Sequence, residues 1–151
     1  MVLAGKLITE VGVKTPADKF YNLFTTQLHD VQKHAEKVHE TKVHEGDWHG
    51  IGSVKHWTYV VDGKVITCLE RVEAIDEQNK TNKYTLFGGD IDPHYKNFTL
   101  ILQVIDNKDS HAVARWTIEY EKLHEDIEPP NGYMEYFNKL TRDVDNQIHK
   151  A

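Results

Sequence analysis

Apolar and polar residues alternate along the first strand-like segment and through most of the middle of the chain. A period of two is typical of a β-strand that buries one face. It predicts a first strand over Leu3–Val13, where Leu7, Thr9 and Val11 alternate with Ile8 and Glu10. Further strands are predicted over Val38–Glu45, Ser53–Val61, Lys64–Ile75, Thr81–Gly88, Phe98–Ile105 and His111–Glu121. Polar turns separate them, and Asp62-Gly63 is a strong two-residue hairpin signal. One large antiparallel sheet is therefore expected.

Helical spacing replaces this alternation in two places. Thr15-Pro16 has the residue types of a helix start, and an apolar face follows it. That face consists of Ala17, Phe20, Tyr21 and Phe24. A second short helix is predicted over Leu28–Ala35. Apolar residues then recur at helical spacing from Tyr133 to Ile148, which predicts a long amphipathic helix. Such a helix must bury its apolar face, and the sheet offers a surface for it. The expected class is α+β.

Composition and charge narrow the function classes. The chain has 151 residues with 39% hydrophobic and 28% charged, enough for one domain over residues 1–151. Its formal charge of −6 disfavours nucleic-acid partners, which need a basic surface. The apolar runs are too short for stable membrane insertion, and no signal peptide is evident. A single cysteine, Cys68, rules out an internal disulfide framework and fits a reducing compartment, so we expect a cytoplasmic protein.

Several motifs together resemble the plant major latex protein and ripening-related branch of the birch-pollen-allergen (Bet v I-type) superfamily. The matching segments are Ala4-Gly5-Lys6-Leu7, His44-Glu45-Gly46-Asp47-Trp48, Gly52-Ser53-Val54-Lys55-His56-Trp57-Thr58-Tyr59 with Asp62-Gly63-Lys64, Gly89-Asp90 with Tyr95-Lys96-Asn97-Phe98, and Trp116-Thr117-Ile118-Glu119-Tyr120-Glu121-Lys122. The resemblance implies a helix-grip (START-like) fold. In that fold a seven-stranded curved antiparallel sheet surrounds the long C-terminal helix, with two short helices after the first strand. It also implies a large internal cavity for small apolar molecules.

Two departures from the family pattern lie close together. Gly88 stands where the family has a glutamate before Gly89, and Asp92-Pro93-His94 is unusual. Both suggest a different shape at the cavity mouth.

Aromatic residues on the inward faces of the predicted strands are candidates for the cavity wall. Core packing alone would also explain them. Buried Tyr and Trp side chains need partners for their polar ends, however, and a lined pocket satisfies this better than a dry core. The predicted ligand-binding residues are Phe24, Leu28, Trp57, Tyr59, Cys68, Tyr84, Leu86, Leu100, Leu102, Trp116, Ile118, Tyr133, Phe137 and Leu140.

Two ionisable residues are also expected to point inward. Across a two-residue turn at Asp62-Gly63, Lys55 lies opposite Glu70. A structural ion pair is the favoured interpretation, and an acid–base role is the alternative. A slip of one residue would turn Thr67 and Leu69 inward instead. Cys68 is expected to be a small buried side chain without a nucleophilic role.

Neither the histidines nor the glycine-rich segment predicts a bound metal or phosphate. His29, His34, His39, His44 and His49 recur every fifth residue, a spacing that places them on no common face. They are expected on the surface, and no metal is predicted. The segment Gly46–Gly52 lacks the Gly-Lys-Ser/Thr ending of a phosphate-binding loop and precedes a strand.

These observations favour a non-enzymatic carrier of small hydrophobic metabolites of lipid, steroid, hormone or phenolic type, linked to plant defence or stress. No cofactor is expected, and the sequence identifies no protein partner. The alternative is an isomerase or condensing enzyme that uses Lys55 and Glu70 as acid–base groups. A ribonuclease fits least well with the charge of −6.

Overall fold

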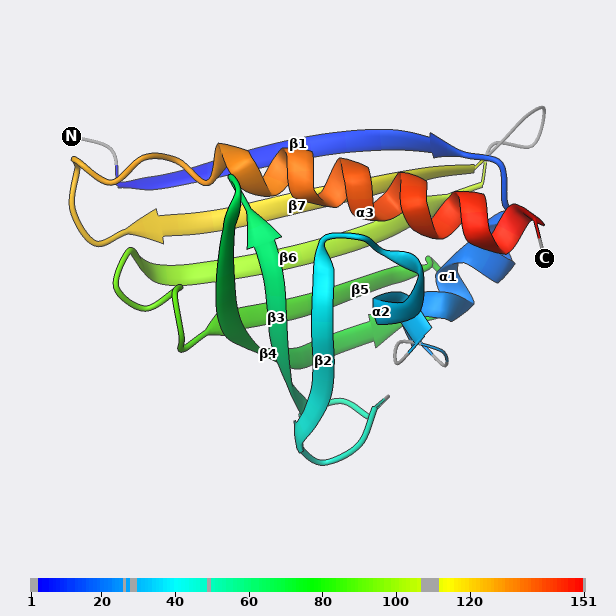
Figure 1. Ribbon diagram of the computed structural model, residues 1–151, viewed down its shortest axis with the longest axis horizontal. Helices are drawn as coiled ribbons and strands as arrows, with labels where there is room; N and C mark the ends of the chain where they lie inside the picture. Colours follow the sequence, from blue (N-terminus) through cyan, green and yellow to red (C-terminus); the bar gives the residue numbers. More distant parts are fainter. Residues whose placement is uncertain (1–2, 26, 28–29, 49, 107–111, 151) are drawn as a thin grey trace.

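The computed structural model describes residues 3–25, 27, 30–48, 50–106 and 112–150. Within these residues one antiparallel sheet of seven strands has the order β1-β7-β6-β5-β4-β3-β2, and the long helix α3 lies across it (Figure 1). The strands are β1 (Ala4–Val13), β2 (Val38–Glu45), β3 (Val54–Val61), β4 (Lys64–Asp76), β5 (Thr81–Phe87), β6 (Tyr95–Ile105) and β7 (Ala112–Lys122). The helices are α1 (Ala17–Thr25), α2 (Val31–His34) and α3 (Asn131–Lys150). The α+β class and the order of elements predicted from the sequence are confirmed.

The differences from the predicted boundaries have local causes. β6 begins at Tyr95, because a register shift between Tyr95 and Asn97 lets the strand continue past an irregularity. β5 ends at Phe87, since Gly88 adopts a φ of 66°, outside the strand region. The predicted second helix is shortened to α2, and Leu28 lies outside the described residues.

The turn between β3 and β4 explains why the register of this hairpin could be predicted. Asp62 and Gly63 both have positive φ, 53° and 76°, as a tight two-residue hairpin turn requires. Lys55 pairs with Glu70, Trp57 with Cys68, and Tyr59 with Ile66. The predicted register is confirmed, and the alternative slip is excluded.

Helix α3 covers the sheet with one apolar face and runs beside β1 and β7 (Figure 1). The Phe137 ring stacks on Trp116 of β7, with ring centroids 4.5 Å apart and an interplanar angle of 15°. One helical turn after Phe137, Thr141 Oγ1 accepts a hydrogen bond from the indole Nε1 of Trp116 at 2.8 Å. Both side chains of the bond are buried, so the indole contributes its apolar surface without losing its polar partner.

A buried carboxylate holds the C-terminal half of α3. Asp145 accepts hydrogen bonds from the backbone N–H of Lys14 at 2.9 Å and of Thr15 at 2.9 Å, and from the Thr15 hydroxyl at 2.7 Å. The loop between β1 and α1 is thus tied to α3 over a sequence separation of 130 residues.

We expect Asp145→Asn to lower the free energy of unfolding by about 2–3 kcal/mol, the usual loss for charge-assisted hydrogen bonds. The amide would also turn an NH₂ donor toward backbone N–H donors. Urea denaturation measures the effect. The control is Asn146→Ala at an exposed neighbouring position, which should change stability by less than about 0.5 kcal/mol. An Asp145→Asn loss as small as that of the control would contradict the anchoring role.

Candidate functional site

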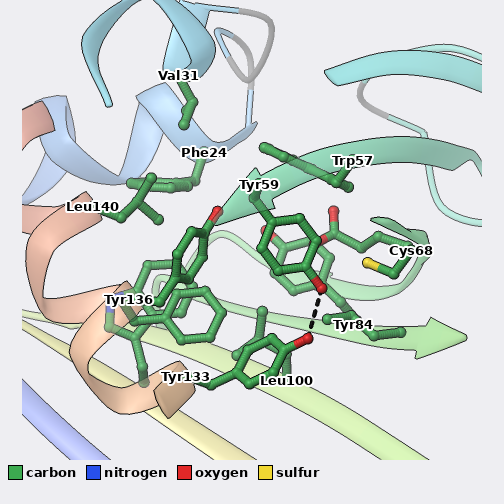
Figure 2. A pocket seen from close by; sticks show the side chains of 14 residues that line it. Phe24, Val31, Trp57, Tyr59, Cys68, Tyr84, Leu100, Tyr133, Tyr136 and Leu140 are labelled. Carbon is green, nitrogen blue, oxygen red and sulfur yellow. Dashed lines mark hydrogen bonds between the residues drawn. The ribbon is translucent and has the colours of Figure 1, made fainter. Parts of the chain in front are cut away.

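A cavity of about 40 Å³ lies between the concave face of the sheet and α3 (Figure 2). The helices α1 and α2 lie at one end of the sheet (Figure 1). β3, β4, β5, β6 and β7 supply one wall, and the N-terminal half of α3 supplies the other. The lining residues are Phe24, Val31, Trp57, Tyr59, Cys68, Glu70, Tyr84, Leu86, Leu100, Trp116, Tyr133, Tyr136, Phe137 and Leu140.

Most of the predicted cavity residues lie on this wall, and two of those that the structure describes do not. Leu102 and Ile118 are completely buried in the core but are not among the lining residues. Alternation identifies the buried face of a strand, but it does not show which part of that face α3 covers. Leu28 lies outside the described residues. The role of the lining residues as ligand contacts stays a prediction.

Three lining residues were not among the predicted ligand-binding residues: Glu70, which was expected to point inward as a partner of Lys55, Tyr136 and Val31. Tyr136 belongs to the apolar face of α3, one helical turn from Tyr133, and its position in that periodic pattern was the available signal. Val31 lies on α2, which is too short for its face to be assigned from spacing.

The cavity is much smaller than the large one that the family resemblance implied. A volume of about 40 Å³ holds a few water molecules, whereas small-molecule sites commonly measure roughly 300–1,000 Å³. Aromatic rings close the space. Tyr136 lies 5.1 Å from Tyr59 and 5.0 Å from Phe137, measured between ring centroids. The cavity is therefore too small for a metabolite in this conformation. A metabolite would fit only after some of these rings had moved.

A tyrosine pair connects the two walls. The Tyr59 and Tyr133 hydroxyls form a hydrogen bond of 2.7 Å, which joins β3 to the first turns of α3 (Figure 2). Burial raises the pKa of both hydroxyls well above the ordinary value. Beside them, burial raises the pKa of the Cys68 thiol to about 12. Cys68 is therefore an uncharged buried thiol at neutral pH, as the sequence predicted, and not an activated nucleophile.

A second polar chain fixes Tyr84. The Tyr21 hydroxyl donates to Asn82 Oδ1 at 2.6 Å, and Asn82 Nδ2 donates to the Tyr84 hydroxyl at 2.8 Å. Asn82 is buried, so this chain satisfies both ends of its amide. The Tyr84 oxygen accepts this bond, which leaves its own proton available for another partner. Asn82 was not foreseen, because strand alternation alone gives no reason to place an amide in the core.

Lys55 and Glu70 are buried opposite one another, as predicted, but they do not form the predicted ion pair. Lys55 Nζ instead reaches along its own strand and donates to Ser53 Oγ at 3.2 Å. Glu70 lines the cavity, and its Oε1 has no hydrogen-bond partner among the described residues. The same holds for Nε1 of Trp57.

Burial dominates the electrostatics of this pair. It raises the pKa of Glu70 to about 7, against the opposing effects of Lys55 and of the nearby Trp57 indole. Burial also lowers the pKa of Lys55. Glu70 therefore exchanges a proton near neutrality inside an otherwise apolar cavity.

Outside the cavity, α2 and the C-terminal half of α3 border a hollow of about 360 Å³, lined by Lys33, His34, Ala35, Glu36, Asp143, Asn146 and Gln147. His39 and His44 are exposed and His34 is partly exposed, while His29 and His49 lie outside the described part of the chain. Among the described residues no three His, Cys, Asp or Glu side chains are grouped to hold a metal ion. None of the helices described is both long and apolar enough to cross a bilayer.

The segment after β5 contains the two departures from the family pattern. The Gly88 N–H donates to Asp92 Oδ1 at 2.9 Å, which closes a tight loop. Gly89 packs on the carbonyl of Thr67 so closely that a Cβ would overlap it. No residue from 88 to 94 is among those that line the cavity.

Comparison with known proteins identifies the family. A model of the pathogenesis-related protein Bet v 1 family matches residues 2–151. The chain belongs to this family. Within it, MLP-like protein 43 of Arabidopsis thaliana is 35% identical over 148 residues, which cover 97% of this chain and 94% of the relative. Major latex protein 146 of Papaver somniferum is 33% identical over 97% of this chain and 92% of its own length.

Solved structures agree with this assignment to the Bet v 1 family. Crystal structures of ginseng major latex-like protein 151 from Panax ginseng include one with a TM-score of 0.91 and 31% identity, covering 96% of this chain and 97% of that one. Ara h 8.0201 has a TM-score of 0.78 at 18% identity over 98% of this chain and 99% of its own, which shows a shared fold. The family assignment and fold made from the sequence motifs are confirmed.

The raised pKa of Glu70 predicts a pH-dependent stability. The pKa rises from 4.5 to about 7 on folding, so the folded chain holds this proton more tightly than the unfolded chain. The resulting stabilisation is complete below pH 4.5 and is lost as the pH rises through 7. We expect the loss to be on the order of 3 kcal/mol.

Urea denaturation at several pH values tests this, with Glu70→Gln as the variant that lacks the titration. Stability of the unsubstituted protein should fall relative to Glu70→Gln over this pH range. Glu73→Gln, at an exposed position of the same strand, should follow the unsubstituted protein. Parallel profiles for the protein and Glu70→Gln would show that Glu70 ionises normally.

Proposed function

We propose that the protein is a non-enzymatic carrier that binds a small hydrophobic metabolite in the cavity between the sheet and α3. The observation that carries this is the composition of the wall. Aliphatic and aromatic side chains make up nearly all of it, and Glu70 is its one charged residue among those described. Such a wall gives affinity through burial of apolar surface and offers few groups for chemistry. Membership of the Bet v 1 family, whose members commonly bind ligands, supports the proposal.

The small volume implies that binding and opening are coupled. Asp145 ties the C-terminal half of α3, whereas the cavity-lining residues of α3 extend from Tyr133 to Leu140. On that side the Tyr59–Tyr133 hydrogen bond links the helix to β3. Breaking this bond and turning the two rings would widen the cavity while Asp145 stays in place. A ligand would then stabilise the open form by its preference for it.

An isomerase or condensing enzyme is the second candidate, favoured by one observation. Glu70 lies in an apolar cavity with a pKa of about 7, which suits a general acid or base. Lys55, the expected partner, is not a lining residue and is bonded to Ser53. The cavity thus lacks the second group of the proposed acid–base pair, and the carrier remains the better interpretation.

Fluorescence titration with 1-aminoanthracene, an uncharged apolar probe, tests the carrier function. We expect saturable binding with a dissociation constant in the micromolar range, about −8 kcal/mol. Tryptophan fluorescence should change as well, since Trp57 and Trp116 line the cavity. Tyr59→Ala should widen the cavity and tighten the binding of bulkier probes. Tyr120→Ala, at a tyrosine outside the cavity, is the matched control.

Two results would contradict the carrier function. One is the absence of saturable binding to both the unsubstituted protein and Tyr59→Ala, with circular dichroism showing that both are folded. The other is catalytic turnover of a bound compound that Glu70→Gln abolishes while binding persists, which would favour the enzyme.

A further inference from the structure

One part of the cavity wall carries hydrogen-bonding groups that the protein itself leaves unused. Among the described residues four buried side-chain polar atoms have no hydrogen-bond partner, and two of them, Trp57 Nε1 and Glu70 Oε1, belong to lining residues. The Trp57 and Glu70 side chains are each at least nine-tenths buried. A buried donor or acceptor without a partner destabilises the fold, so a pair at one cavity wall calls for an explanation.

The strand register brings these two groups together. Trp57 on β3 pairs with Cys68 on β4, and Glu70 follows two residues later on the same face. Trp57 and Glu70 are therefore diagonal neighbours on the concave side of the sheet. Hydrogen bonding by the Trp57 indole lowers the pKa of Glu70, so the two side chains lie within reach of each other. Their present orientation nevertheless leaves Trp57 Nε1 and Glu70 Oε1 without a hydrogen bond of normal length and angle, and a hydroxyl placed between them could bond to both.

Most other polar groups around the cavity already have a hydrogen-bond partner within the protein. Trp116 also lines the cavity, but its Nε1 donates to Thr141. The Tyr59 and Tyr133 hydroxyls bond to each other. Tyr84 accepts from Asn82. The Tyr84 proton and the Tyr136 hydroxyl are also available for hydrogen bonding, but among the described lining residues only Trp57 and Glu70 have a fully buried polar atom without a partner.

We infer that Trp57 and Glu70 form a polar subsite for a neutral hydroxyl group carried on a flat aromatic ring, so that the ligand is of the phenol class. This inference rests on the proposed carrier function. A hydroxyl oxygen accepts from the indole N–H, and the hydroxyl proton is donated to Glu70 Oε1. One group of the ligand then satisfies both buried atoms.

Charged head groups satisfy only one of the two. An ammonium group has no lone pair to accept from the indole, so Trp57 stays unpaired. A carboxylate accepts from Trp57 but has no proton to donate, so it repels an ionised Glu70 and can pair only with the protonated form of that residue. The aromatic side chains of Tyr59, Tyr136 and Phe137 provide faces against which a flat ring can pack.

Four probes with one ring system test the subsite on the unsubstituted protein. They are naphthalene, 2-naphthol, 2-naphthoate and 2-(aminomethyl)naphthalene, each measured by displacement of 1-aminoanthracene at neutral pH. We expect 2-naphthol to bind about tenfold tighter than naphthalene, the factor that about 1.4 kcal/mol of hydrogen bonding supplies. Both charged probes should bind more weakly than 2-naphthol. Equal binding of naphthalene and 2-naphthol, or tighter binding of either charged probe, would overturn the inference.

Two substitutions test whether Trp57 and Glu70 cause the preference for 2-naphthol over naphthalene, and each has a matched control. Trp57→Phe removes the unpaired N–H, and Glu70→Met replaces the carboxyl group with an apolar side chain of similar length. Either should lower the ratio of naphthalene to 2-naphthol dissociation constants toward one, because each removes one of the two hydrogen bonds to the hydroxyl. Trp48→Phe, at a tryptophan that does not line the cavity, and Glu73→Met, at an exposed position, should keep the ratio of the unsubstituted protein.

The two proposals fail in different ways. A ratio that survives both Trp57→Phe and Glu70→Met would place the hydroxyl elsewhere and overturn the subsite while leaving the carrier intact. Failure of naphthalene itself to displace 1-aminoanthracene, together with no saturable 1-aminoanthracene binding, would remove the carrier function. If a variant does not fold by circular dichroism, the order of the four probes on the unsubstituted protein still decides.

Discussion

The packing of α3 against the concave face of the sheet determines where everything else in this molecule lies. The helix has one apolar face, and the curved sheet is the surface that buries it. The Trp116–Phe137 stack sets the phase of the helix at its middle. Once that phase is set, Tyr133 and Tyr136 must project toward β3, and the space between them and the sheet becomes the cavity. The fold and the candidate site are therefore consequences of the same contact.

The two halves of α3 are held by different kinds of interaction. Near the C-terminus, Asp145 makes charge-assisted bonds to backbone groups, which cannot move without displacing the chain. Near the N-terminus, the link to β3 is the bond between two hydroxyls, Tyr59 and Tyr133, which rotate on side chains. The distance from Tyr133 to Asp145 along the helix is about 18 Å, at 1.5 Å per residue. Rigidity and adaptability thus occupy separate parts of one element.

Sequence reasoning succeeded where local geometry decides the outcome and failed where tertiary packing does. The register around Asp62-Gly63 followed from the turn, because two consecutive residues of positive φ allow one tight hairpin geometry. The Lys55–Glu70 ion pair did not form, since register places two strands but not the end of a flexible side chain. Cavity volume was beyond prediction for the same reason. It depends on ring orientations and on the height of α3 above the sheet, and neither has a signature in the order of residues.

The separation between the Asp145 anchor and the cavity has an evolutionary consequence. Substitutions on the lining part of α3, or at Trp57 and Glu70, change the shape and polarity of the cavity without touching the bonds that hold the helix to Thr15. Replacements at these lining positions could therefore alter what the cavity accepts while the Asp145 anchor stays intact. Trp116 and Phe137 are the exception, because they line the cavity and also hold α3 on the sheet, so a change there affects both specificity and stability.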